Sequence, residues 1–176
     1  MKNSIFVLAL LLLVSCKNKT EINKTVPYED TVILLGPANE VGFKQEPFQA
    51  WYDTNYVDYK VDEASIDELK SLSKNIKIKT FMGTWCEDSQ RETPNFYKLL
   101  EVIAFNKKDH SLFAVSREKT TPQQFEKDLN ITNVPTFIFY KDGREINRIV
   151  EYPIESLEKD MLAILSGKDY KHAYAE

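Results

Sequence analysis

The chain has 176 residues, 43% hydrophobic and 12% aromatic, which is enough for one globular domain and excludes a disordered chain. Its net charge of −4 excludes the polycationic surface that nucleic-acid binding requires, so we expect no nucleic-acid partner. Two cysteines cannot build a disulfide framework or a four-thiolate zinc site, and two scattered histidines add no metal cluster, so we expect neither a metal nor a cofactor.

Residues 1–16 have the pattern of a bacterial targeting segment. A short basic start precedes the apolar run 5–14, and about ten apolar residues suit a signal peptide, whereas a membrane-spanning helix needs about 20. The segment ends in Leu13-Val-Ser-Cys16, which resembles the lipobox of bacterial lipoproteins. That resemblance implies a lipid on the Cys16 thiol, attachment to a membrane of the cell envelope, and a folded domain in the periplasm. An ordinary signal peptide with a stray cysteine is the alternative.

Two segments precede the predicted core. Residues 17–27 are polar and lack apolar periodicity, which predicts a tether. Residues 28–61 form an aromatic-rich N-terminal extension, in which the apolar run Thr31–Leu35 predicts a buried strand. Further along the extension, aromatics at helical spacing predict an amphipathic helix packed on the core, with a carbohydrate- or peptide-binding platform as the alternative. These aromatics are Phe48, Trp51, Tyr52 and Tyr56.

Alternating strands and helices follow from residue 62. Ser65-Ile-Asp-Glu68 has the form of a capping box and predicts a helix to about residue 73, and the acidic residues around it are interpreted as solvated. Ile76–Met82 begins in strict alternation, which predicts a strand. Residues 87–105 have helical periodicity, and we expect the following apolar side chains to be buried: Phe96, Leu99, Leu100, Val102 and Ile103.

The second half of the chain completes an α/β pattern. Leu112–Val115 predicts a strand, and Thr121-Pro-Gln-Gln124 predicts the start of a short helix to about Leu129. Two β-rich runs, 136–140 and 145–150, flank Asp142-Gly143, the strongest short signal for a hairpin.

A last helix is predicted over Ile154–Leu165, ending at Gly167, and residues 168–176 are a polar tail. The order of elements predicts a mixed sheet, which is parallel where helices cross over and antiparallel at the hairpin.

Cys86 lies where the predicted strand 76–82 turns into the predicted helix 87–105. The N-terminus of a helix favours a thiolate, through the helix dipole and unpaired backbone N–H groups. Glu87 and Asp88 follow directly, and their carboxylates oppose it. We therefore expect a thiol of moderate reactivity.

Three motifs resemble the thioredoxin-like family. Trp85-Cys-Glu-Asp-Ser89 occupies the place of the family's Trp-Cys-x-x-Cys site, Pro94 that of the proline that kinks the active-site helix, and Asn133–Gly143 that of the cis-proline segment and hairpin. The resemblance covers about residues 62–167, with Thr31–Leu35 as the first strand.

The resemblance implies a thioredoxin-like fold, a mixed central β-sheet flanked by helices, here with an N-terminal extension. It also implies that the bond between Val134 and Pro135 is cis and faces Cys86.

Three departures from the family's pattern bear on function. Ser89 replaces the second cysteine, so no disulfide can form within the site. Thr80 replaces the buried acid, which removes the usual proton acceptor, and Glu151 replaces a glycine beside the substrate groove. A two-cysteine cycle is therefore excluded for this chain by itself.

The resemblance and the departures together predict a single-thiol exchange protein. Cys86 would attack a disulfide or a sulfenic acid and form a mixed disulfide, and a second thiol from elsewhere would resolve it. Trp85 would shield the site, Ser89 would hydrogen-bond the sulfur, and Val134 and Pro135 would present backbone to the substrate. The expected partners are thiol- or disulfide-containing envelope proteins or small thiols. The alternative is a redox-inactive binding or scaffolding lipoprotein with the same fold.

Other cysteine chemistries fit less well. Peroxiredoxins require threonine where Gly83 stands, and phosphatase loops require arginine where Glu92 stands. A Cys–His pair would need His110 or His172 to reach Cys86, but these lie at the far end of the predicted helix and in the tail. Both histidines are interpreted as exposed.

Overall fold

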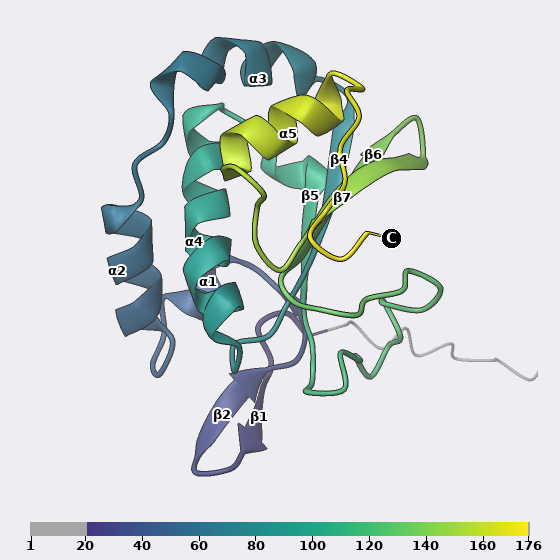
Figure 1. Cartoon of the computed structure of the whole chain (residues 1–176). Coiled ribbons are helices and arrows are strands. Elements are labelled where there is room, and N and C mark those ends of the chain that lie inside the picture. The colour runs from purple at the N-terminus through teal and green to yellow at the C-terminus, as the bar shows by residue number, and fades with distance from the viewer. Residues whose placement is uncertain (1–20, 176) are drawn as a thin grey trace, which may run out of the picture.

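The computed structural model describes residues 21–175 and shows an α/β fold around a mixed sheet (Figure 1). The predicted signal peptide and Cys16 lie outside the described residues. The elements are β1 (Thr25–Tyr28), β2 (Thr31–Leu34), β3 (Gly36–Ala38), α1 (Glu40–Phe43), α2 (Gln49–Asp58), α3 (Ile66–Leu72), β4 (Ile76–Met82), α4 (Glu87–Val102), β5 (His110–Ala114), β6 (Thr136–Lys141), β7 (Arg144–Val150) and α5 (Leu157–Leu165). Short 3-10 helices, Glu63–Ser65 and Lys107–Asp109, precede α3 and β5.

The central sheet has the strand order β3-β5-β4-β6-β7. Strands β4 and β5 are parallel, because α4 crosses over between them. The other neighbours are antiparallel, and the predicted turn at Asp142 and Gly143, with φ of 51° and 78°, joins β6 to β7. The predicted mixed sheet is therefore confirmed, and so are the predicted strand Ile76–Met82 and the hairpin.

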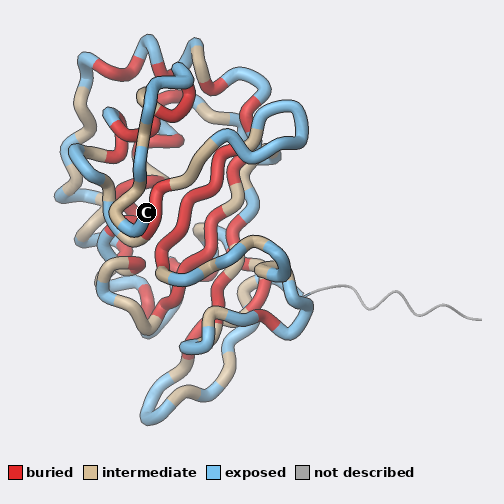
Figure 2. Tube along the Cα trace, turned by 45° about the vertical axis from the view of Figure 1, so that its right-hand side comes forward, coloured by how far each residue is buried: buried red, intermediate tan, exposed pale blue. Residues whose placement is uncertain are grey.

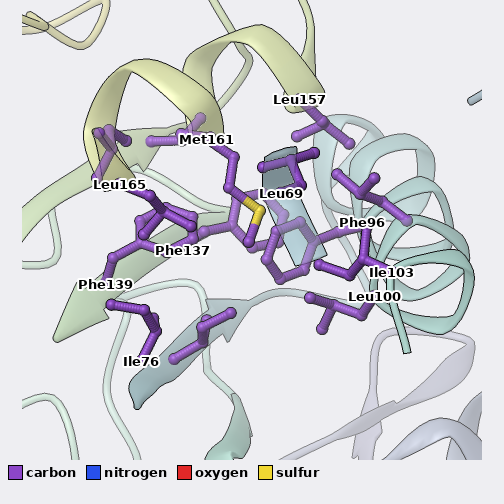
Figure 3. Packing of buried hydrophobic residues seen from close by; sticks show 14 of the residues in the cluster. Leu69, Ile76, Phe96, Leu100, Ile103, Phe137, Phe139, Leu157, Met161 and Leu165 are labelled. Carbon is purple, nitrogen blue, oxygen red and sulfur yellow. The ribbon is translucent and has the colours of Figure 1, made fainter. Parts of the chain in front are cut away.

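One face of the sheet carries the main hydrophobic core beneath the helices. Figure 3 shows Phe96 of α4 against the aromatic side chains of β6, with Met161 of α5 and Leu69 of α3 completing the layer. The ring centroids of Phe96 and Phe137 are 4.2 Å apart. This core holds α4, and with it the residue at its N-terminus, firmly against β4.

The aromatic residues of the N-terminal extension extend this core. Tyr52 of α2 is 1% exposed and stacks on Phe43 of α1 with centroids 5.6 Å apart. Both residues also pack against Tyr97 of α4. The predicted amphipathic helix is therefore confirmed, and its aromatic side chains are core material rather than an open binding platform.

On the opposite face of the sheet, the irregular segment 116–134, which carries no helix, covers the part around Phe81 and Phe113, whereas Lys77 and Ser111 farther along the strands are exposed. The predicted helix from Thr121 to Leu129 is wrong, because Gln124, Asp128 and Asn130 have positive φ values of 57°, 62° and 50°. Left-handed residues at this spacing interrupt every possible run of helical hydrogen bonds. Phe125 nevertheless stacks on Phe113 of β5, with centroids 4.5 Å apart, so the segment is well packed. Figure 2 shows it as a largely exposed strip across the buried strands.

The N-terminal region differs from the prediction in two ways. The predicted first strand, observed as β2 (Thr31–Leu34), pairs with β1 in a separate two-stranded sheet, and β3 takes the edge of the central sheet instead. Gly36, with φ of +97°, redirects the chain between them. Strand β1 begins at Thr25, so the last residues of the predicted tether 17–27 are ordered in this hairpin.

Several helix boundaries and faces also differ. The N-terminal cap before α3 is Asp62, which accepts from the Ala64 amide, and Ser65 does not cap the helix as predicted. Helix α5 begins at Leu157 rather than at residue 154, because Ser156 accepts from the Lys159 amide. Val102, predicted to be buried, is 41% exposed at the end of α4.

The polar tail is attached to the core. The Tyr170 hydroxyl donates to Asp160 of α5 (2.8 Å), and the Tyr170 carbonyl accepts from Asn147 of β7 (2.9 Å). Within residues 21–175, no helix combines the length and hydrophobicity needed to cross a membrane.

Candidate functional site

Cys86 lies at the N-terminus of α4, as predicted, immediately beyond the end of β4. Its amide donates to the Gly83 carbonyl (3.0 Å), and its carbonyl accepts from the Gln90 amide (2.9 Å). Gly83 permits this tight turn, since a Cβ there would lie 2.5 Å from the Trp85 ring. The turn places a half-buried thiol beyond the C-terminal end of β4, the middle strand of the sheet.

The predicted cis-proline segment faces the cysteine. The Val134–Pro135 bond is cis, and the Cys86 thiol donates to the Val134 carbonyl across 3.2 Å. The Pro135 carbonyl accepts from the Glu151 amide (2.7 Å), which connects this segment to the end of β7. The structure thus brings Cys86, Val134 and Pro135 together, although they are far apart in sequence.

Ser89 is fully buried one turn into α4, and its hydroxyl accepts from the Gly83 amide (3.1 Å). The sequence-based expectation that Ser89 hydrogen-bonds the sulfur is not what the structure shows. The serine instead stabilises the turn that presents Cys86.

Trp85 is held over the site by contacts that the sequence does not indicate. Its indole N–H donates to the Val115 carbonyl (2.9 Å), and the Arg117 guanidinium lies 4.8 Å from its ring centroid. Arg117 also donates from Nε to the Tyr28 hydroxyl (2.6 Å). Sequence reasoning missed Arg117 and Tyr28, because neither belongs to a motif and Tyr28 comes from the appended hairpin.

The two carboxylates after Cys86 differ in their surroundings. Asp88 pairs with Arg91 at 2.6 Å, and Arg91 also contacts Glu92 at 2.8 Å. Glu87 is exposed. Burial raises the pKa of Glu92, and Arg91 only partly offsets that effect.

Thr80 occupies the position of the family's buried acid and is fully buried. Its hydroxyl lies 2.9 Å from His110 Nε2. The interpretation of His110 as an exposed residue at the end of the helix is wrong: it begins β5, and its ring packs against Phe96 and Tyr97. Burial lowers the pKa of His110 to about 4, so its imidazole is neutral at physiological pH.

Glu151 occupies the glycine position near the groove with φ of +69°. Its carboxylate accepts from the Asn133 amide group (3.3 Å) and contacts the Tyr174 hydroxyl. The left-handed backbone that a glycine favours is therefore retained, with a carboxylate added beside the Val134–Pro135 segment.

A cavity of about 480 Å³ lies away from Cys86, between α4 and the β3 edge of the sheet. Its lining includes Ala38, Tyr97, Leu100, His110 and Leu112. Among residues 21–175, no group of His, Cys, Asp and Glu has the arrangement of a metal site.

Comparisons with known proteins agree with this geometry. The family model described as Thioredoxin matches residues 39–164. A thioredoxin-like protein of Acanthamoeba polyphaga mimivirus is 28% identical over 90 residues, which cover 51% of this chain and 63% of that protein. Thioredoxin-like protein CXXS2 of Arabidopsis thaliana is 27% identical over 101 residues, which cover 57% of this chain and 61% of that protein. The chain thus spans about three fifths of the length of these relatives.

The fold also has solved counterparts. A protein of unknown function from Pseudomonas aeruginosa aligns with 72% of this chain and 89% of its own length, with a TM-score of 0.55 at 15% identity. This likeness supports the thioredoxin-like fold alone. The family model, however, spans more than half of the sequence, and the chain therefore belongs to the thioredoxin family.

Proposed function

We propose that this protein is a thiol–disulfide exchange protein that works through one thiol, Cys86. The observation that carries the proposal is the half-buried Cys86 thiol at the start of α4, 3.2 Å from the Val134 carbonyl of the cis-proline segment. Ser89, at the position of the second cysteine, is bonded to backbone. The letters CXXS in the name of the Arabidopsis relative match the pattern Cys86-Glu-Asp-Ser89 of this chain.

The chemistry requires no oxidant or reductant beyond the substrate. The Cys86 thiolate attacks one sulfur of a substrate disulfide, a Cys86–substrate disulfide forms, and the other substrate sulfur leaves as a thiolate. That thiolate, or another substrate thiol, then attacks the mixed disulfide and releases Cys86 as a thiolate. The number of disulfides is unchanged, so the cycle rearranges disulfides or transfers them between thiols.

The surroundings of Cys86 suit this cycle. In the resting state the Val134 carbonyl accepts a hydrogen bond from the Cys86 thiol, and a substrate that reaches the sulfur would meet the backbone of this segment. Trp85 covers one side of the sulfur, and its indole N–H is already bonded to Val115. The fixed indole limits the approach of solvent without competing for the substrate.

We further propose that Cys16 carries a lipid and that the exchange takes place at a membrane of the bacterial cell envelope. The apolar run 5–14 and the lipobox-like end of the segment support this placement. The substrates are then envelope proteins or small thiols, and Cys86 is the only thiol in the lipidated chain.

Scrambled-disulfide refolding tests the redox proposal directly. The protein carrying Cys16→Ser should accelerate recovery of a scrambled disulfide enzyme, because Cys86 is then its only thiol, and the further change Cys86→Ser should abolish the acceleration. Cys86→Ala serves as a second variant, and thermal unfolding of each protein checks that the fold is retained. Equal rates with and without Cys86 would instead identify a redox-inactive binding protein.

A further inference from the structure

The side chain of Arg117 is held by two aromatic residues, one of which, Trp85, directly precedes Cys86. Its guanidinium carbon lies 4.8 Å from the ring centroid of Trp85 and 5.8 Å from that of Tyr28. Its Nε donates to the Tyr28 hydroxyl at 2.6 Å. A surface arginine usually samples many rotamers, whereas these contacts keep this guanidinium next to the residue that precedes Cys86.

The contact with Tyr28 depends on the appended hairpin. Tyr28 ends β1, and the hairpin is fastened to the β4–α4 junction where the Leu34 amide donates to the Thr84 hydroxyl (3.2 Å). The bond to Thr84 reaches the loop that presents Cys86 directly, and the contact of Tyr28 reaches it through Arg117 and Trp85. The hairpin therefore borders the candidate site, although it is not part of the central sheet.

Arg117 makes no close ion pair among residues 21–175, although the carboxylates of Glu29 and Glu118 interact with its charge at longer range. Within residues 21–175, no carboxylate lies within 4.0 Å of the guanidinium, and its two terminal nitrogens have no hydrogen-bond partner. The pKa of Arg117 is raised, first by the hydrogen bond to Tyr28 and more weakly by Cys86 among other groups. The terminal N–H groups of this exposed side chain are therefore available to an anion beside Trp85, the residue that precedes Cys86. A planar guanidinium of this kind binds a carboxylate through two parallel hydrogen bonds.

We propose that Arg117 is an anion-binding subsite that selects disulfides and thiols carrying a carboxylate close to the reacting sulfur. This inference rests on the proposed exchange function and names its substrate class. The guanidinium would hold the substrate carboxylate while Cys86 attacks the neighbouring sulfur. It would also offset the repulsion that the exposed Glu87 exerts on an acidic substrate.

Reaction rates with two small disulfides test the proposal. The protein carrying Cys16→Ser is mixed with 5,5′-dithiobis(2-nitrobenzoate), whose rings carry carboxylates, and separately with neutral 4,4′-dithiodipyridine. Arg117→Gln should lower the rate constant for the carboxylate disulfide about tenfold and change that for the neutral disulfide less than about twofold. The difference should shrink in high salt, because an exposed charge is screened.

Two further variants sharpen the result. Tyr28→Phe keeps the ring but removes the hydrogen bond to Nε, so it should give an intermediate, selective loss. Lys119→Gln removes another positive charge from the same loop and should leave the ratio of the two rate constants unchanged. An equal loss with both disulfides after Arg117→Gln, or no loss with either, would overturn the proposal.

The failure of this inference and that of the proposed function are distinguishable. The rates follow a single attack by Cys86 and require no turnover. A protein that is inactive in refolding of scrambled disulfides but selective for the carboxylate disulfide would retain the anion subsite and lose the exchange function. A protein that is active in refolding but does not prefer the carboxylate disulfide would support the exchange function and overturn the anion subsite.

Discussion

At the scale of single residues, the pair formed by Thr80 and His110 replaces the buried acid of the family. A hydroxyl and a neutral imidazole at 2.9 Å satisfy each other without placing a charge in the core. Phe96 and Tyr97 pack against the ring, and this burial keeps the pKa of His110 near 4. Among residues 21–175, no carboxylate accepts a hydrogen bond from Cys86, and its thiol donates to the Val134 carbonyl instead.

The lowered pKa of His110 predicts a pH dependence of stability. The unfolded chain takes up a proton at a pKa of about 6.5, whereas the folded protein does so only near 4, so the unfolded state binds more protons between these values. Lowering the pH from 7 to 4 should therefore cost the wild type about 2–3 kcal/mol of unfolding free energy through this residue.

Urea denaturation at several pH values measures this loss. In His110→Gln, residue 110 does not titrate in this range and can still hydrogen-bond Thr80. Between pH 7 and 4 this variant should therefore lose about 2–3 kcal/mol less unfolding free energy than the wild type. Carboxylates such as Glu92 titrate in both proteins and cancel in the comparison. Parallel stability curves for the two proteins would contradict the burial of a neutral His110.

At the scale of elements, the segment 116–134 takes the place of a helix and connects Arg117 to Val134 at the site. Thr121 organises its centre: the hydroxyl accepts from the Phe125 amide (2.9 Å) and donates to Glu126 (2.6 Å). The segment is also held at its end, where the Leu129 carbonyl accepts from Arg148 of β7 (2.8 Å). An irregular segment with these contacts can cover a sheet face as a helix would.

Removal of the Thr121 hydroxyl should destabilise the protein. Thr121 is 5% exposed, and Thr121→Val leaves the Phe125 amide without its partner, which should cost about 1–3 kcal/mol of unfolding free energy. Thr121→Ser keeps the hydroxyl and should lose clearly less. Denaturant unfolding of the two variants provides the measurement, and a loss in Thr121→Ser as large as that in Thr121→Val would contradict the role given to the hydroxyl.

At the scale of the whole molecule, helices cover one face of the sheet, an irregular segment packs against the other, and the β1–β2 hairpin projects from one end of the molecule (Figure 1). The hairpin begins at Thr25, within the predicted tether 17–27. A lipid on Cys16 would therefore hold the candidate site a short chain length from the membrane surface.

Membrane attachment is tested by expression of the full chain in a bacterium with radiolabelled palmitate. The wild type should take up the label and sediment with membranes, and Cys16→Ser should do neither. Cys86→Ser is the matched control, because it removes the other cysteine and should leave labelling unchanged. Labelling that persists in Cys16→Ser would refute the lipid anchor.

Much of the fold could be predicted from local sequence patterns. Alternation in Ile76–Met82, helical periodicity after residue 87 and the turn chemistry of Asp142-Gly143 each depend on neighbouring residues alone, so these elements appear where they are expected. The helix predicted at 121–129 is wrong. Its cap signal depends on local residues, whereas the conformation of the segment is decided by how its side chains pack against the sheet.

The sequence by itself determined the order of elements and the position of Cys86 at a strand-to-helix junction, because short-range periodicity and turn chemistry encode both. Only the tertiary structure decided what surrounds that thiol. The burial of His110 and the stacking of Arg117 between Trp85 and Tyr28 join segments that are distant along the chain. Such contacts arise from how the hairpin, the sheet and the loop pack together, and no single segment carries a signal for them.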